Sequence, residues 1–404
     1  MAGERHDTDV RNSADHALQN GKGNGVKVST SVKSPRTFDG IMTEEELLNG
    51  VRHEVQVKKL PAKANAGLLD FYYNYRDSVI KSGVDNAVEI AVKIMATVFD
   101  RIMFQFEEPY TFPPYHTRIL EPYNYYAFGQ NFIKHLVDLR NSFVGNIATF
   151  GQIESQLKQG HNVILFSNHQ SEADPAVMAL LLDFCHPYLS EKMTFIAGDR
   201  VVFDPFCKPF SMGRNFLCVH SKKHINDVPA LAEMKKKANA QTLKEMAGLL
   251  AKGGQFIWIA PSGGRDRPDP ETNEVRPAQF DAAAVENTRR LLSQMPVPGH
   301  MYPLALSCYE IMPPPHQVEK ELGERRLLGY DGAGIVVASE LRFDDLTAGT
   351  TSKEQARDKF SQSSWEIVNE QYSVLRKAIH GRQGLQASSQ STQLSQPWFD
   401  RQQK

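Results

Sequence analysis

A histidine and an aspartate five positions apart are the residues of this 404-residue chain whose types and spacing most favour catalysis. His169 and Asp174 lie in the segment Ser-Asn-His-Gln-Ser-Glu-Ala-Asp-Pro, residues 167–175, directly after a short apolar run. A carboxylate that accepts a hydrogen bond from one imidazole nitrogen fixes the tautomer and leaves the other nitrogen able to take a proton from a hydroxyl group. The pair is therefore a candidate general base with its orienting acid. The alternative is that Asp174 only caps a helix and His169 only satisfies loop backbone.

A second segment, residues 260–268, combines small residues with cations after another apolar run. Gly263 and Gly264 would let the backbone approach a ligand closely, and Ser262 beside them is a supporting candidate. Arg265 and Arg267 offer planar guanidinium groups that suit phosphate or carboxylate oxygens. This loop therefore predicts an anion site, with a solvated turn as the alternative.

A third segment places Lys223 and His224 directly after a further apolar run. Residues 222–244 as a whole hold six lysines against two acids, so this stretch is locally basic. Such a patch could dock an acidic protein or membrane surface, and the run at 235–237 is its densest part. The alternative is a solvated helix face without a partner.

These loops can meet only if the elements between them form one sheet. Short β-branched and aromatic runs at 162–166, 194–197, 216–219, 255–259, 303–306 and 334–338 alternate with helical segments. This alternation predicts an α/β domain with a mixed, mostly parallel sheet flanked by helices. Because Asp174-Pro175 is typical of a helix start, with Asp174 at the N-cap, His169 should lie in the loop between a strand and that helix. The three loops then open on one edge of the sheet.

The chain divides into four predicted segments. Residues 1–38 have few apolar side chains and read as disordered, either a transit-like segment or a plain flexible tail. Residues 39–114 form a small helical-bundle domain, with a capping box at Thr43 and Glu46 and further helices near 62–80 and 84–106. The α/β domain follows over 115–385. Residues 386–404 are a loose C-terminal tail, in which Trp398 is the residue that could hold it to the core.

Composition excludes several classes of protein. Lys and Arg number 46 against 47 Asp and Glu, so no whole-chain charge favours nucleic acid. The four cysteines form no C-x-x-C pair, which disfavours a zinc knuckle and a disulfide scaffold. No apolar run reaches the length of a transmembrane segment. The P-loop, dinucleotide-binding, zincin and α/β-hydrolase motifs are absent from the sequence.

Several blocks in order resemble those of the plant plastidial glycerol-3-phosphate acyltransferases. The resemblance runs from about Thr43 to Trp398. It rests on residues 128–131, 167–175, 197–200, 207–215, 257–270, 298–300 and 311–315. A lone His and Asp with four residues between them would be weak evidence, whereas this ordered set is specific.

The resemblance implies a small N-terminal helical domain on a larger α/β domain. It implies transfer of an acyl group from acyl-acyl carrier protein, with acyl-CoA as a substitute donor, to the sn-1 hydroxyl of glycerol-3-phosphate in the chloroplast stroma. The catalytic pair of the family falls on His169 and Asp174, and its phosphate-binding residues fall on Lys223, His224, Arg265 and Arg267. A thioester donor is already activated, so we expect neither a metal nor a cofactor.

Two alternatives to this function remain at the level of sequence. The same histidine and aspartate would serve acylation of a lysophospholipid, although the paired arginines and the lack of a membrane span favour a small phosphate ester. A different class of protein, a non-catalytic binding module for phosphorylated metabolites or for acyl carrier protein, would use the pair only as a helix cap.

Overall fold

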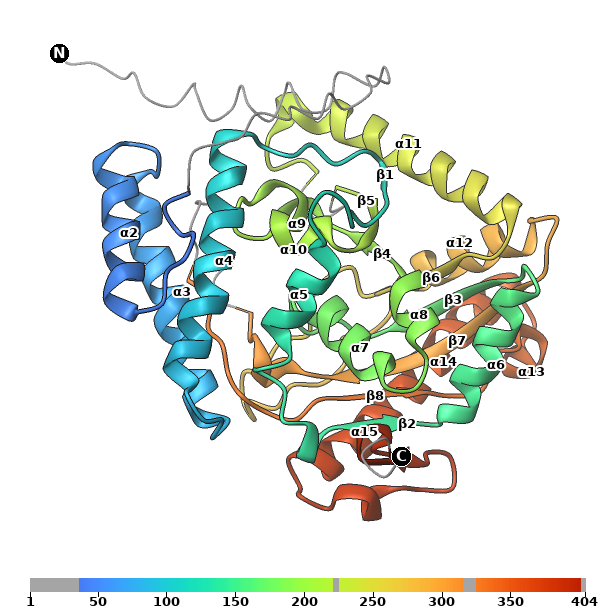
Figure 1. Cartoon of the computed structure of the whole chain (residues 1–404). Helices are drawn as coiled ribbons and strands as arrows, with labels where there is room; N and C mark the ends of the chain where they lie inside the picture. Colours follow the sequence, from blue (N-terminus) through green and yellow to red (C-terminus); the bar gives the residue numbers. More distant parts are fainter. Residues whose placement is uncertain (1–35, 221–224, 315–324, 401–404) are drawn as a thin grey trace.

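The computed structural model describes residues 36–220, 225–314 and 325–400 (Figure 1). Of the predicted N-terminal segment 1–38, only residues 36–38 fall within these ranges. Lys223 and His224 lie outside the described residues, as do residues 401–404.

Within the described ranges, a nine-stranded mixed sheet forms the centre of the fold, in the order β1-β5-β4-β6-β3-β7-β8-β2-β9. Its strands are β1 (Tyr115–His116), β2 (Phe143–Gly145), β3 (Asn162–Ser167), β4 (Thr194–Ala197), β5 (Asn215–Cys218), β6 (Phe256–Ile259), β7 (Gly299–Ser307), β8 (Gly334–Val337) and β9 (Leu394–Ser395). The five central strands from β5 to β7 are parallel, whereas β8 is antiparallel to β7, and β1 and β9 are antiparallel to their neighbours. The predicted mixed, mostly parallel sheet is confirmed.

All six predicted strands are present, and the sheet contains three further strands that the sequence did not predict. The strands β1, β2 and β9 have two or three residues each. So short a run carries no alternation of apolar and polar residues that could distinguish it from a loop. These segments are extended because each pairs with a neighbouring strand of the sheet.

Helices cover both faces of the sheet, and β3 shows why its sequence is apolar throughout. Val163 and Leu165 belong to the apolar cluster that contains α5 and α7 residues, while Ile164 and Phe166 belong to the cluster that contains residues of α11, α12 and α14. Successive side chains of a strand point to opposite faces, so a strand buried on both sides alternates between two cores. Between β1 and β9, the α-helices of the described residues are α5 (Tyr125–Ile133), α6 (Ile147–Lys158), α7 (Asp174–Asp183), α8 (Pro187–Lys192), α9 (Asp199–Phe203), α10 (Lys208–Met212), α11 (Pro229–Lys252), α12 (Ala282–Ser293), α13 (Phe343–Thr347) and α14 (Lys353–Ile379).

Three N-terminal helices stand beside the sheet: α2 (Glu44–Gln56), α3 (Ala62–Lys81) and α4 (Ala87–Glu107) (Figure 1). The predicted capping box is present, because the Thr43 hydroxyl accepts from the Glu46 N–H and the Glu46 carboxylate accepts from the Thr43 N–H. Their apolar side chains continue the cluster that covers the α5 and α7 face, and the Tyr75 hydroxyl donates to the Phe132 carbonyl oxygen over 2.9 Å. Among the described residues, no helix has the length and apolar character to cross a membrane.

The C-terminal segment is not the loose tail that its Gln-rich and Ser-rich composition predicts. The strand β9 pairs with β2 and closes one edge of the sheet, and α15 (Pro397–Asp400) follows it. The indole N–H of Trp398 donates to the Leu139 carbonyl oxygen over 2.8 Å, and its ring meets the Phe184 ring edge-on. The expectation that Trp398 holds the segment to the core is therefore confirmed. The composition misled because polar side chains here bond the neighbouring backbone: the Gln396 amide donates to the Arg140 carbonyl oxygen over 2.9 Å.

Candidate active site

The loops that carry the predicted site residues leave the same edge of the sheet. Strands β3 and β6 are parallel neighbours, and β4 joins β6 to β5 with all three parallel. Residues 168–173 follow β3, residues 260–268 follow β6, and the segment with Lys223 and His224 follows β5. The predicted shared rim is confirmed for the first two loops, and the third lies outside the described residues.

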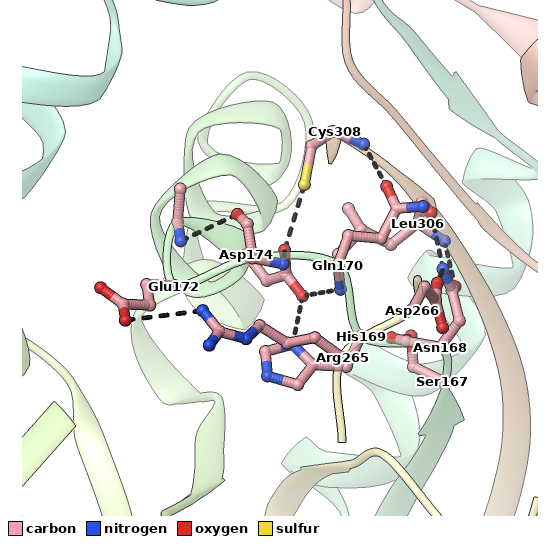
Figure 2. A network of polar contacts seen from close by, with 12 residues as sticks. Ser167, Asn168, His169, Gln170, Glu172, Asp174, Arg265, Asp266, Leu306 and Cys308 are labelled. Atoms are coloured by element: carbon pink, nitrogen blue, oxygen red, sulfur yellow. Dashed lines mark hydrogen bonds and ion pairs between the residues drawn. The ribbon is translucent and has the colours of Figure 1, made fainter. Parts of the chain in front are cut away.

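His169 and Asp174 lie within hydrogen-bond distance. The Nδ1 atom of His169 is 2.7 Å from Oδ2 of Asp174 (Figure 2). Asp174 is the first residue of α7, and Ala173 occupies the cap position without a side-chain cap bond. The N-cap prediction for Asp174 was therefore wrong by one residue. Its carboxylate turns back into the loop instead, where it accepts from the backbone N–H groups of Gln170 and Ser171.

Four donors surround the carboxylate of Asp174, whose side chain is completely buried. Oδ2 accepts from His169 Nδ1 and from the Gln170 backbone N–H at 2.8 Å. Oδ1 accepts from the Ser171 backbone N–H at 2.8 Å and from the Cys308 thiol, with Sγ at 3.1 Å. Two oxygens with two donors each use about all the lone pairs that a carboxylate has. Such a set replaces the hydrogen bonds to water that a carboxylate loses on burial.

This contact decides the tautomer of His169. An ionised carboxylate only accepts hydrogen bonds, so Nδ1 carries the proton and Nε2 is the ring atom that can take one. The imidazole is 28% exposed, and its ring makes a T-shaped contact with the Trp258 ring, with centroids 5.5 Å apart. The histidine is thus held on two sides and accessible from the rim, as a general base must be.

The loop after β6 is tied to the loop after β3. The Asp266 N–H donates to the His169 carbonyl oxygen over 2.6 Å, and the Asp266 carboxylate accepts from the Asn168 amide and the Ala278 N–H at 2.8 and 2.9 Å. Asp266 is fully buried, so its partners are these groups of neighbouring segments and not solvent. Burial raises the pKa of Asp266 to about 6, against the lowering effect of these hydrogen bonds.

The other predicted residues of the loop after β6 lie on either side of Asp266 in the sequence. Gly263 adopts a left-handed φ of 66°, and the Ser262 hydroxyl donates to the Gly264 carbonyl oxygen over 2.9 Å, so these residues form the turn. Arg265 is largely buried and Arg267 is exposed. Burial raises the pKa of Tyr309, and the charges of both guanidinium groups oppose that rise, so both arginines act on this tyrosine.

A buried charged cluster that the sequence did not indicate lies beside Arg265. Glu172 Oε1 is 3.5 Å from Arg265 Nη1, and Glu172 Oε2 is 3.3 Å from Arg326 Nε. Arg326 also pairs with Asp204, and the Cys207 thiol donates to Glu172 over 3.3 Å. Glu172 lies between His169 and Asp174 in sequence and could have been considered with them. Arg326 follows no motif and is more than 150 positions from Glu172, so only the fold reveals this contact.

Comparisons with known proteins match this architecture. Residues 35–110 match the family model described as glycerol-3-phosphate acyltransferase N-terminal, and residues 151–307 match the model described as acyltransferase. The glycerol-3-phosphate acyltransferase, chloroplastic, of Arabidopsis thaliana is 52% identical over 363 residues, which cover 90% of this chain and 79% of the relative. The proteins of the same name from Pisum sativum and Phaseolus vulgaris are 51% and 49% identical, and the alignments cover 91% and 95% of this chain and 81% and 83% of the relatives.

The helix-flanked sheet, the rim histidine and the matched model together define an acyltransferase. The alignments cover 79% and 81% of the first two relatives, so the similarity extends well beyond the residues that match the acyltransferase model. The chain belongs to the family of plant chloroplastic glycerol-3-phosphate acyltransferases.

The raised pKa of Asp266 predicts a pH-dependent stability. Its folded-state pKa of about 6 exceeds the ordinary value of 3.8, so its contribution is fully present below pH 4 and is lost as pH rises through 6. Asparagine does not ionise, so the Asp266→Asn variant does not lose stability in this way as pH rises. We expect the free energy of unfolding of the variant to rise relative to that of the parent by about 3 kcal/mol between pH 4 and pH 7. Urea denaturation across this range measures the difference.

Asp269→Asn is the matched control in the same loop. Hydrogen bonds from Thr272 and Glu271 lower the pKa of this exposed carboxylate below 3.8, so its contribution changes mainly below pH 4, and the difference between its variant and the parent should stay nearly constant between pH 4 and pH 7. A difference between Asp266→Asn and the parent that does not change with pH would contradict the assignment.

Proposed function

We propose that this protein transfers an acyl group from acyl-acyl carrier protein to the sn-1 hydroxyl of glycerol-3-phosphate, which gives 1-acyl-glycerol-3-phosphate. The observation that carries the proposal is the ordered pair of His169 and Asp174 on the rim where Arg265 also lies. Membership of the family supports glycerol-3-phosphate as the acceptor. The relatives are named as chloroplastic, and we propose the chloroplast stroma as the compartment of this chain.

In the proposed mechanism His169 is the general base. Nε2 takes the proton of the attacking hydroxyl as its oxygen bonds to the thioester carbonyl carbon. The tetrahedral intermediate then expels the thiolate of the carrier, the C–S bond breaks, and the imidazolium returns the proton to sulfur. Asp174 stabilises the imidazolium and holds its ring in one orientation.

The cations of the rim would bind the phosphate of the acceptor. Arg265 and Arg267 come from the loop after β6, and we assign Lys223 and His224 to the same role from the sequence, since they follow β5. Glu172 contacts both Arg265 and Arg326, and Asp204 pairs with Arg326, so two carboxylates balance the two guanidinium groups of this cluster. Fixing the phosphate there would hold the hydroxyl near Nε2 and turn binding energy into proximity. The turn formed by Ser262, Gly263 and Gly264 shapes this loop.

We further propose that α11 docks the acidic acyl carrier protein. Lys236 and Lys237 are exposed on this helix, one turn from Asn239. The Asn239 amide donates to the His220 carbonyl oxygen over 2.9 Å, which fixes this part of α11 beside the end of β5. The lysine run thus lies toward the rim with the proposed base, where a carrier must deliver its thioester. Acyl-CoA is the substitute donor in this proposal.

Separate substitutions should separate the base from the phosphate site. His169→Ala removes the base and should lower kcat by about 10²- to 10⁴-fold with little change in KM for glycerol-3-phosphate. Arg267→Ala removes a charge-assisted contact and should raise that KM by roughly 10- to 100-fold with a smaller effect on kcat. Steady-state kinetics with acyl-acyl carrier protein measure both.

His53→Ala, at an exposed position of α2, is the control and should keep the kinetics of the parent. Undiminished turnover by a folded His169→Ala variant would refute the assignment of the base. The parent should also be offered a lysophospholipid beside glycerol-3-phosphate, and a preference for the lysophospholipid would refute the acceptor. Binding of glycerol-3-phosphate without any acyl transfer would favour a binding module.

Charge reversal on α11 tests carrier docking. The double variant Lys236→Glu and Lys237→Glu should raise KM for acyl-acyl carrier protein by roughly tenfold at low salt, and by less at high salt, because surface charges act over a screened range. KM for glycerol-3-phosphate should stay the same. Lys252→Glu, at the other end of α11, is the control. Equal carrier kinetics in the double variant and in this control would exclude α11 as the docking helix.

A further inference from the structure

Side chains continue the pairing of β3 with β7 after β3 has ended. The two strands pair in register up to Ser167 opposite Leu304. Beyond that point the Asn168 side chain exchanges two hydrogen bonds with the Leu306 backbone, over 2.9 Å each. Two positions further on, Gln170 Oε1 accepts from the Cys308 backbone N–H over 2.7 Å. The loop with His169 is thus fastened to the end of β7 at alternate residues.

This register places the thiol of Cys308 beside the carboxylate of Asp174. Cys308 is the residue after β7, its side chain is fully buried, and Sγ lies 3.1 Å from Asp174 Oδ1 (Figure 2). The other donor to Oδ1 is the Ser171 backbone N–H. Without the thiol, this oxygen would keep one donor in a place that water does not reach.

We propose that Cys308 is a positioning residue of the acyl-transfer reaction, whose thiol fixes the carboxylate of Asp174 and through it the imidazole of His169. The proposal rests on the proposed function of the His169 and Asp174 pair. Cys308 is buried behind Asp174 and does not reach the rim, so it does not touch the substrate. Its part is to prevent the carboxylate from turning away from Nδ1, since a small displacement of a catalytic group slows the reaction strongly.

The thiol acts as a donor and not as a nucleophile. Burial raises the pKa of Cys308, and the neighbouring charge of Asp174 raises it further. The sulfur therefore keeps its proton at physiological pH, and that proton is the one that Oδ1 accepts. Such a bond is weak between neutral partners and stronger when the acceptor is a charged carboxylate.

Paired substitutions separate the hydrogen bond from the packing of the side chain. Cys308→Ala removes the donor and should lower kcat by roughly tenfold, with KM for glycerol-3-phosphate unchanged. Cys308→Ser keeps a donor on a shorter side chain and should restore kcat to within about threefold of the parent. Cys185→Ala, which removes a thiol near the end of α7, should behave as the parent. Thermal unfolding of each variant shows which of them are folded.

An infrared spectrum tests the contact without turnover. The S–H stretch absorbs where few other protein groups do, so the difference between the parent and Cys308→Ser isolates the band of this thiol. We expect a band shifted to low frequency by the charged acceptor, and a smaller shift in Asp174→Asn. This measurement needs no substrate. An inactive parent would therefore refute the proposed function, whereas the frequency of the S–H band would still test the contact between Cys308 and Asp174.

Three results would overturn the proposal. A folded Cys308→Ala variant with the kcat of the parent would show that the thiol does not position Asp174. An equal loss in Cys308→Ser and Cys308→Ala would assign the effect to packing. A Cys308 band at the frequency of a thiol without a hydrogen bond would show that the contact does not form in solution.

Discussion

The carboxylate of Asp174 is the group around which the rim is arranged. A completely buried charge is tolerated only where donors replace the water that it has lost, and Asp174 has four. Two come from the backbone of its own loop, one from His169 and one from Cys308 at the end of β7. Because these donors come from the loop after β3 and from the residue after β7, the carboxylate links β3, α7 and β7 at one point. The hydrogen bond to Asp174 and the T-shaped contact with the Trp258 ring together set the orientation of His169.

Charge on the rim is balanced over several residues. Asp266 ties the β6 loop to the backbone of His169, which sets the distance between the base and the arginines. Glu172 then shares its carboxylate between Arg265 and Arg326. Arg326 is itself buried and pairs with Asp204, so the cluster extends away from the rim into the protein. Burial makes the loss of one partner costly, because the remaining charge would be left uncompensated in the protein interior.

Local patterns allowed much of this to be predicted from the sequence. The apolar runs located the six longer strands, and the order of strand and helix placed the predicted loops at one edge. Asp174-Pro175 located the start of α7 to within one residue, which put His169 in the loop. The arginines were evident from the composition of their loop. The roles of these residues and the division of the chain into domains stay predictions.

Contacts between distant segments could not be predicted in this way. Cys308 lies far from Asp174 in sequence, and only the register of β7 against β3 brings its thiol to the carboxylate. The same holds for Arg326, and for β9, whose two residues become a strand because β2 offers an unpaired edge. The contacts of Asp266 could not be predicted for a related reason, since its sequence neighbours are arginines whereas its spatial neighbours are Asn168 and Ala278.

The turnover of Asp174→Asn tests the central claim most directly. Asparagine keeps the size of the side chain but places an amide N–H where donors already point, so it cannot hold His169 with the proton on Nδ1. With acyl-acyl carrier protein and glycerol-3-phosphate as substrates, we expect kcat to fall by about 10³-fold or more while the variant stays folded. A folded Asp174→Asn variant with kcat within threefold of the parent would contradict the account, because the buried carboxylate would then not be what orients the base.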